Sequence, residues 1–349
     1  MIYQGKKIWE ENPDVAEPYR ERYFEGCRSF IERMNAESRE ARIGRMERIS
    51  TDAEREEYRE RYLSMLGVDR IAPCAASPER VFVGEDDVCT IFRLTVRITP
   101  EIPFYALLLI PHGAKNAPLI VAQHGGGGTP ELCSDFVGKN NYNHMVRRLL
   151  ARGAVVLAPQ LLLWSRQESE TMRACKPDFN RAKIDNSLKR FGLSITGLET
   201  KGIMKAIDYA SALDEVDENR IGMIGISYGG YYTLNTMAAE PRIKAGYSVA
   251  AFNDKDVYDG SDWCYTGSAL LFQDAELAAL CAPRKLFVSV GTQDHVFDWK
   301  TASEEASLAA SYYQKQGFEG RFRFSVRDCG HTLPDDDEGL DFLFSALNE

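Results

Sequence analysis

Short apolar runs alternate with helical segments from about residue 119 to the end of the chain. The apolar runs are 119–122, 154–158, 221–226, 245–250, 286–290 and 322–326. The segments with helical character are 140–151, 195–214, 229–239, 301–316 and 338–347. Strands that are buried on both faces read as continuous apolar runs, and their alternation with helices is typical of βαβ units. The pattern therefore predicts an α/β protein with a mostly parallel, doubly wound sheet.

A different pattern precedes this region. Runs with strand character at 81–83, 90–98 and 105–110 are separated by turn-forming residues at 84–87 and 100–103. Consecutive strands joined by short polar turns form antiparallel meanders. We therefore expect antiparallel N-terminal strands ahead of the parallel part of the sheet.

The first part of the chain has the periodicity of amphipathic helices. Apolar residues recur there at three- and four-residue steps: Val15, Tyr19, Tyr23, Phe24, Cys27, Phe30, Ile31 and Met34. A second helix is expected to begin at residues 51–54, where Thr-Asp-Ala-Glu fits a capping box. We divide the chain into an N-terminal helical arm, residues 1–76, and a larger α/β domain, residues 77–349. The apolar face of the arm must pack against something.

Two connections in the larger domain, residues 159–194 and 252–283, are too long for simple loops between a strand and a helix. Both leave the C-terminal edge of strands, which is where open α/β sheets bind ligands. We expect these segments to form walls of a substrate pocket, with Trp164, Phe179 and Trp263 as apolar contacts. The alternative is that they only elaborate the surface.

The motif G-x-S-x-G occurs at residues 225–229, directly after the apolar strand 220–224 and at the start of a helical segment. A sharp turn between a strand and a helix holds such a serine in a strained backbone conformation, with its hydroxyl group above the sheet. The context therefore predicts that Ser227 is a nucleophile.

A glycine-rich stretch follows the run 119–122, where the sequence reads Gln-His-Gly-Gly-Gly-Gly at 123–128. Glycines leave backbone N–H groups unshielded, so the N–H of Gly125 or Gly126 could join that of Tyr228 in an oxyanion hole. The alternative is a flexible glycine turn.

A serine needs a base to take its proton, and histidine is the usual choice. The five histidines are His112, His124, His144, His295 and His331. The chain order for a turn of this kind is serine, acid, histidine, which leaves the last two. We favour His331, because it follows the last predicted strand.

The orienting acid should lie on a loop after a strand near the nucleophile. Asp294 follows the strand 286–290 after a short turn and is our candidate. Asp298 is the alternative, although it is better placed as a cap for the next helix. Asp328 and Asp335 are weaker candidates.

At these residues the chain resembles the acetylxylan-esterase-like and dienelactone-hydrolase-like branch of the α/β hydrolases. The segments with this resemblance are 215–222, 281–284, 291–294 and 330–331, within a region of about 100–349. The resemblance implies the α/β-hydrolase fold, a triad of Ser227, Asp294 and His331, and no metal or organic cofactor. Dienelactone hydrolases proper have cysteine at the nucleophile turn, so serine here favours an esterase.

The composition argues against several kinds of partner. The formal net charge is −10 at pH 7, and the basic residues of the first 70 positions alternate with Glu, so nucleic-acid binding is not expected. No stretch approaches the roughly 18 apolar residues of a membrane span, and the start of the chain lacks the apolar core of a secretory signal, which favours the cytoplasm. The eight cysteines include no C-x-x-C pair, so we expect reduced thiols and no zinc site.

These features predict a serine hydrolase that cleaves a carboxylic ester of a small molecule or a carbohydrate, for example an acetyl ester. Two alternatives stay open: a peptidase similar to prolyl oligopeptidases, and a ligand-binding protein of the same fold without catalysis. The sequence is compatible with a homo-oligomer.

Overall fold

The computed structural model describes residues 1–46, 49, 51–75, 77–138, 140–163, 180–258, 260 and 262–349. The chain divides into two compact units, Met1–Arg45 and Met46–Glu349. The sequence groups the first two helices into one arm that ends at residue 76. In the structure the second of these helices instead packs within the larger unit.

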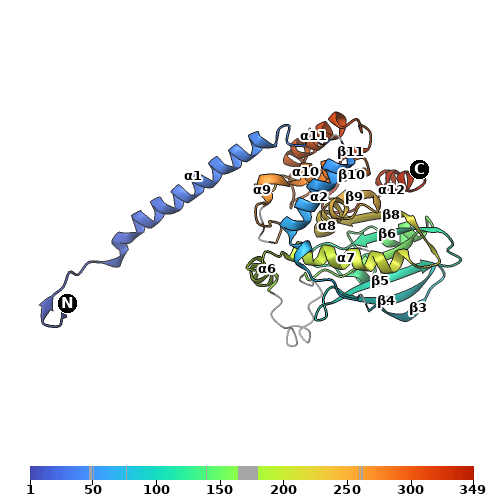
Figure 1. Cartoon of the computed structure of the whole chain (residues 1–349), viewed down its shortest axis with the longest axis horizontal. Coiled ribbons are helices and arrows are strands. Elements are labelled where there is room, and N and C mark those ends of the chain that lie inside the picture. The colour runs from blue at the N-terminus through green and yellow to red at the C-terminus, as the bar shows by residue number, and fades with distance from the viewer. Residues whose placement is uncertain are drawn as a thin grey trace. The chain divides into compact units, whose positions relative to one another are not determined.

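The smaller unit is built around one long helix (Figure 1). Strands β1 (Ile2–Tyr3) and β2 (Lys6–Lys7) pair antiparallel, the short helix η1 (Pro13–Ala16) follows, and α1 spans Glu17–Arg42. The amphipathic helix expected from the sequence is present. Within this unit the side chains of its apolar stripe are exposed, including Tyr19, Tyr23 and Phe30.

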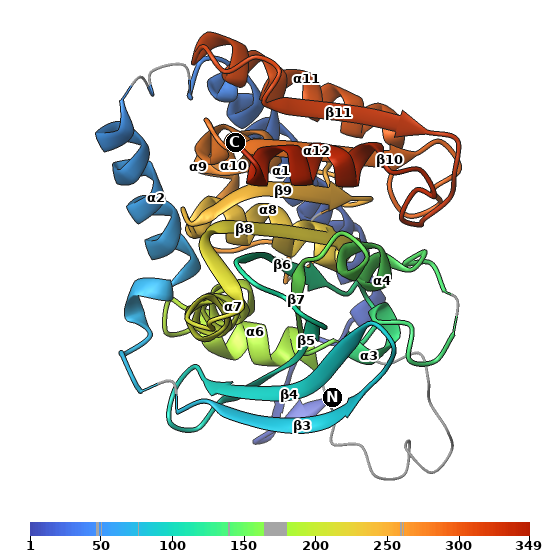
Figure 2. The same cartoon turned by 90° about the vertical axis from the view of Figure 1, so that its right-hand side faces the viewer.

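Among its described residues the larger unit has one sheet of nine strands in the order β11-β10-β9-β8-β6-β7-β5-β4-β3. The strands are β3 (Glu79–Glu85), β4 (Cys89–Arg97), β5 (Pro103–Pro111), β6 (Ala117–Gln123), β7 (Val155–Pro159), β8 (Val216–Ile226), β9 (Ile243–Val249), β10 (Lys285–Gly291) and β11 (Phe322–Arg327). Pairing is antiparallel from β3 through β5 to β7, and parallel from β7 to β11. Figure 2 shows this order from β11 to β3. The predicted fold class is confirmed.

Helices cover both faces of this sheet. They are α2 (Asp52–Leu66), η2 (Val68–Arg70), α3 (Pro130–Cys133), α4 (Met145–Leu150), α6 (Arg181–Lys189), α7 (Ile195–Ser211), α8 (Tyr228–Ala239), α9 (Ser268–Leu271), α10 (Asp274–Cys281), α11 (Trp299–Lys315) and α12 (Glu338–Leu347). Successive residues of β6 belong to different cores: Leu119 and Val121 pack with one apolar cluster, and Ile120 with the other. A strand that is buried on both faces reads as an unbroken apolar run for this reason.

Helix α2 begins at the capping box that the sequence predicts. The Thr51 hydroxyl oxygen accepts the backbone N–H of Glu54 at 3.2 Å, and the Glu54 carboxylate accepts the backbone N–H of Thr51 at 3.0 Å. The opposite end of the helix buries Tyr62 and Leu66 completely. The Tyr62 hydroxyl donates to Asn235 on α8, so α2 is part of the layer that covers the sheet.

Among the helices of the described residues, none combines the length and the apolar character needed to cross a membrane.

Candidate active site

The sharp turn between β8 and α8 holds Ser227. This residue has φ +58° and ψ −122°, a backbone conformation that residues other than glycine rarely adopt. The neighbouring glycines allow the turn to pass under β6, since a Cβ on Gly229 would lie 2.1 Å from the carbonyl oxygen of Gln123. The G-x-S-x-G segment thus forms the strained strand-to-helix turn that its sequence predicts, with Ser227 at its apex.

Asp294 and His331 are hydrogen-bonded to each other. The Nδ1 of His331 lies 2.8 Å from Oδ2 of Asp294, whose side chain is completely buried. The other carboxylate oxygen accepts the backbone N–H groups of Val296 at 2.7 Å and Phe297 at 3.2 Å. Burial alone would raise the pKa of Asp294, but the hydrogen bonds from His331 and these N–H groups lower it. An ionised carboxylate can only accept hydrogen bonds, so Nδ1 carries a proton, and in the neutral ring Nε2 keeps its lone pair.

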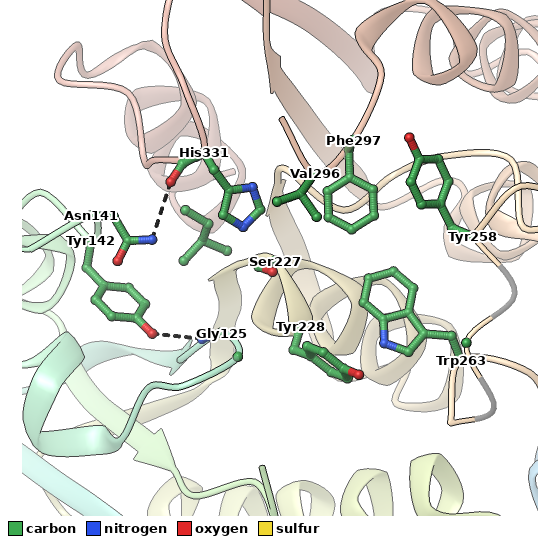
Figure 3. Close-up of a pocket in the computed structure, with 13 residues that line it drawn as sticks. Gly125, Asn141, Tyr142, Ser227, Tyr228, Tyr258, Trp263, Val296, Phe297 and His331 are labelled. Carbon is green, nitrogen blue, oxygen red and sulfur yellow. Dashed lines mark hydrogen bonds between the residues drawn. The ribbon is translucent and has the colours of Figure 1, made fainter. Parts of the chain in front are cut away.

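Ser227 and His331 line the same cavity, which has a volume of about 320 Å³. Figure 3 shows Gly125, Asn141 and Tyr142 on one side of Ser227, with Trp263, Phe297 and Tyr258 on the other. The lining residues of the cavity are Gly125, Gly126, Asn141, Tyr142, Ile226, Ser227, Tyr228, Tyr258, Gly260, Trp263, Val296, Phe297 and His331. The described chain therefore brings together the residues that the sequence analysis assigned to nucleophile, base and oxyanion hole.

The competing acids and bases lie in other surroundings. Asp298 is the N-cap of α11, where its Oδ1 accepts the backbone N–H of Lys300 at 2.9 Å. His295 is exposed. Asp328 accepts hydrogen bonds from the side chains of Thr292 and Gln293. In this geometry Asp294 is the carboxylate bonded to the His331 ring.

The glycine-rich loop passes directly over the nucleophile turn. A Cβ on Gly125 would lie 2.8 Å from the carbonyl oxygen of Ile226 and 3.1 Å from Cβ of Ser227, so only glycine fits there. The Gly125 N–H donates to the hydroxyl of Tyr142 at 2.9 Å. The two glycines named as candidate oxyanion donors therefore differ, because the N–H of Gly125 already has a partner within the protein.

His124 fixes the start of this loop, a role that the sequence analysis did not assign. Its Nε2 accepts the backbone N–H of Leu161 at 3.0 Å, so Nδ1 carries the proton and donates to the carbonyl oxygen of Gly125 at 2.9 Å. Burial lowers the pKa of His124 to about 4. The neutral ring ties the glycine loop to the segment that follows β7.

Residues 141–143 connect the glycine loop to the loop of the histidine, and they too were missed from the sequence. The Asn141 side chain donates to the carbonyl oxygen of His331 at 3.3 Å, and the Asn141 carbonyl accepts the Thr332 hydroxyl at 2.9 Å. Asn143 donates to the Thr332 hydroxyl at 3.2 Å. With Tyr142 bonded to the glycine loop, this short segment holds both sides of the site. The one sequence signal is its run of asparagines beside a tyrosine.

The long connection 252–283 brings Trp263 to the cavity wall. The Tyr228 hydroxyl donates to Asp262 at 3.0 Å, and Asp262 pairs with the buried Arg181 at 2.5 Å. Arg181 also forms a two-pronged ion pair with Glu199 at 2.9 and 3.0 Å. In the other long connection, residues 159–194, the two expected wall residues Trp164 and Phe179 lie outside the described residues.

Sequence comparison finds a family match and several curated relatives. Residues 196–275 match the prolyl oligopeptidase family. An uncharacterised protein, YcjY of Escherichia coli K12, is 39% identical over 162 residues, 46% of this chain and 44% of that protein. A 2,6-dihydropseudooxynicotine hydrolase of Paenarthrobacter nicotinovorans is 30% identical over 89 residues, 24% of each chain. The chain thus matches less than half the length of these two curated relatives.

Among solved structures, the fold is similar to that of acetyl xylan esterase 1 from Thermoanaerobacterium sp. JW/SL YS485. The TM-score is 0.57 at 18% identity, and the similarity covers 84% of this chain and 94% of the esterase. At an identity this low, the structural similarity shows a shared fold only. The chain thus has the α/β-hydrolase fold in a form similar to that of acetyl xylan esterases, and the prolyl oligopeptidase match covers its nucleophile turn.

Proposed function

We propose that the protein is a serine hydrolase that cleaves carboxylic esters through an acyl-enzyme on Ser227. The observation that supports this most is the 2.8 Å hydrogen bond between Asp294 and His331. His331 lines the same cavity as Ser227, which lies in a strained turn. Nucleophile, base and orienting acid are the three roles that acyl transfer by a serine requires.

In this mechanism Nε2 of His331 takes the hydroxyl proton of Ser227 as Oγ attacks the carbonyl carbon of the ester. A C–O σ bond forms, and the π electrons move onto the carbonyl oxygen. Collapse of the tetrahedral intermediate breaks the bond to the alcohol, which leaves with the proton held by His331. Water then attacks the acyl-enzyme in the same way, with His331 again taking and returning the proton, which releases the acid and restores Ser227. Asp294 holds the ring in the required tautomer and stabilises its protonated form.

The negative oxygen of the intermediate needs N–H donors. We assign this role to the backbone N–H groups of Gly126 and Tyr228. Gly126 lines the cavity, and Tyr228 follows the nucleophile as the first residue of α8. The Gly125 N–H, the third candidate, is bonded to Tyr142. A donor of this kind contributes about 10²- to 10³-fold to kcat.

Ester cleavage has one competitor with an observation in its favour. The match of residues 196–275 to the prolyl oligopeptidase family makes peptide hydrolysis the second candidate. An acetyl ester of a carbohydrate is the substrate suggested by the similarity in fold to acetyl xylan esterases, and that part of the proposal rests on the fold alone.

The test is labelling with a fluorophosphonate, together with hydrolysis of p-nitrophenyl acetate, acetylated xylose and a proline-containing peptide. The protein should be labelled and should cleave the esters, while Ser227→Ala should lose labelling and about 10³-fold or more in kcat. Turnover of the peptide alone would favour the second candidate. Absence of labelling in the folded protein would make it a ligand-binding member of the superfamily.

A further inference from the structure

The wall of the cavity opposite the glycine loop is aromatic. The Trp263 ring stacks on Phe297 with centroids 5.6 Å apart and an interplanar angle of 22°, and it meets Tyr228 edge-on at 5.0 Å. Phe297 packs against Tyr258 at 4.9 Å. Figure 3 shows these side chains beside Ser227. We call Tyr228, Tyr258, Trp263 and Phe297 the aromatic wall.

The aromatic wall is held rigidly from behind. Tyr231, which is buried, stacks on Trp263 with centroids 4.7 Å apart and an angle of 19°. The Tyr228 hydroxyl is bonded to Asp262, whose carboxylate is fixed by the buried Arg181. Rings fixed in this way lose little conformational entropy when a ligand packs on them.

Several polar groups of the lining side chains have a partner within the protein. The Tyr258 hydroxyl accepts the backbone N–H of Asp298 at 2.8 Å, and the Tyr142 hydroxyl accepts that of Gly125. The Asn141 amide donates to the carbonyl oxygen of His331. A sugar hydroxyl that displaced one of these bonds would leave a buried polar group without its partner, which is costly.

We propose that this cavity takes an aromatic ring, so that the preferred substrate is an ester with an aryl group close to its carbonyl. The inference rests on the proposed function of Ser227. The volume of about 320 Å³ is enough for one ring beside the ester, since a cavity of about 150 Å³ already accommodates benzene. Offset-stacked and edge-to-face contacts with the aromatic wall favour a flat ring over a saturated one of similar size by up to about tenfold.

The ring could belong to the acid or to the alcohol, and binding to the intact protein distinguishes the two. Benzyl alcohol against cyclohexylmethanol probes the alcohol side, and phenylacetamide against cyclohexylacetamide probes the acyl side, each by NMR titration. We expect the aromatic member to bind several-fold tighter in at least one pair. Trp263→Leu and Phe297→Leu, which keep apolar side chains, should reduce that preference. Trp9→Ala removes an exposed tryptophan of the smaller unit and should preserve it.

Turnover provides the second measurement. Benzyl acetate and cyclohexylmethyl acetate test the alcohol side, and ethyl phenylacetate and ethyl cyclohexylacetate test the acyl side. Each pair should differ in kcat/KM in the same direction as the corresponding binding pair. Equal binding in both pairs would overturn the inference, as would a preference that persists in both leucine variants. A higher kcat/KM for acetylated xylose than for benzyl acetate would also overturn it. Ring binding without hydrolysis of any ester would support the aromatic-ring site, reject the proposed function and overturn the assignment of an ester substrate.

Discussion

At the scale of single residues, two aspartates four positions apart have different roles in the geometry. Asp294→Asn should lower kcat by up to about 10⁴, because an amide cannot hold His331 in the tautomer that leaves Nε2 free. Its Oδ1 can still accept the backbone N–H groups of Val296 and Phe297, so the melting temperature should change little. Asp298→Asn replaces one good helix cap by another and serves as the matched control. Steady-state kinetics with p-nitrophenyl acetate and thermal melts check both. Loss of activity in Asp298→Asn alone would identify that residue as the acid.

Tyr142 is the residue through which the glycine loop is held. Tyr142→Phe should lower kcat/KM by roughly tenfold and destabilise the fold by about 1 to 3 kcal/mol, since the buried N–H of Gly125 loses its acceptor. Tyr313→Phe is the control, because its hydroxyl donates to the carbonyl oxygen of Arg284 in the core between α11 and the sheet. That variant should lose stability without a matching loss of rate. Similar rate losses in the two variants would contradict a positioning role for Tyr142.

At the scale of elements, the two N-terminal helices differ in what they bury. Tyr62 on α2 is completely buried and contacts Phe272 with ring centroids 5.3 Å apart, whereas Tyr23 on α1 is 76% exposed. Tyr62→Ala should reduce the free energy of unfolding by about 3 to 5 kcal/mol, and Tyr23→Ala should change it by less than about 0.5 kcal/mol. Urea unfolding of both variants measures this. A large loss in Tyr23→Ala would mean that the apolar stripe of α1 is covered in solution.

At the scale of the whole molecule, His124 links stability to pH. Its folded-state pKa of about 4 lies below the value of about 6.5 expected in the unfolded chain. Between these values the unfolded state binds more protons, so the free energy of unfolding should fall by about 3 kcal/mol as the pH drops from about 6.5 to about 4. His124→Gln should flatten this decline, measured by urea unfolding across the range. His295→Gln, at an exposed position, should leave it unchanged. An identical decline in all three proteins would show that His124 is not its source.

Much of the fold follows from the local pattern of the chain. The apolar runs at 119–122 and 286–290 became β6 and β10 with ends moved by only a few residues, because a strand buried on both faces must be apolar throughout. The strained turn at Ser227 was equally predictable, since the glycines around it are required by backbone contacts less than 3 Å away. The motif itself is local in sequence, which is why it can be recognised, although the closest contact of Gly229 is with Gln123 on β6.

By itself, then, the sequence determined the kind of sheet, the nucleophile turn and the residue types available for catalysis. The tertiary structure alone decided contacts that the sequence analysis did not name: Tyr142 with Gly125, and Trp263 with Phe297. It also decided that α2 packs against α8 while the apolar stripe of α1 is exposed within its own unit. The reason is physical. Hydrogen bonds and ring contacts act over a few ångströms between segments that are distant along the chain, and periodicity does not encode which distant segments the fold brings together.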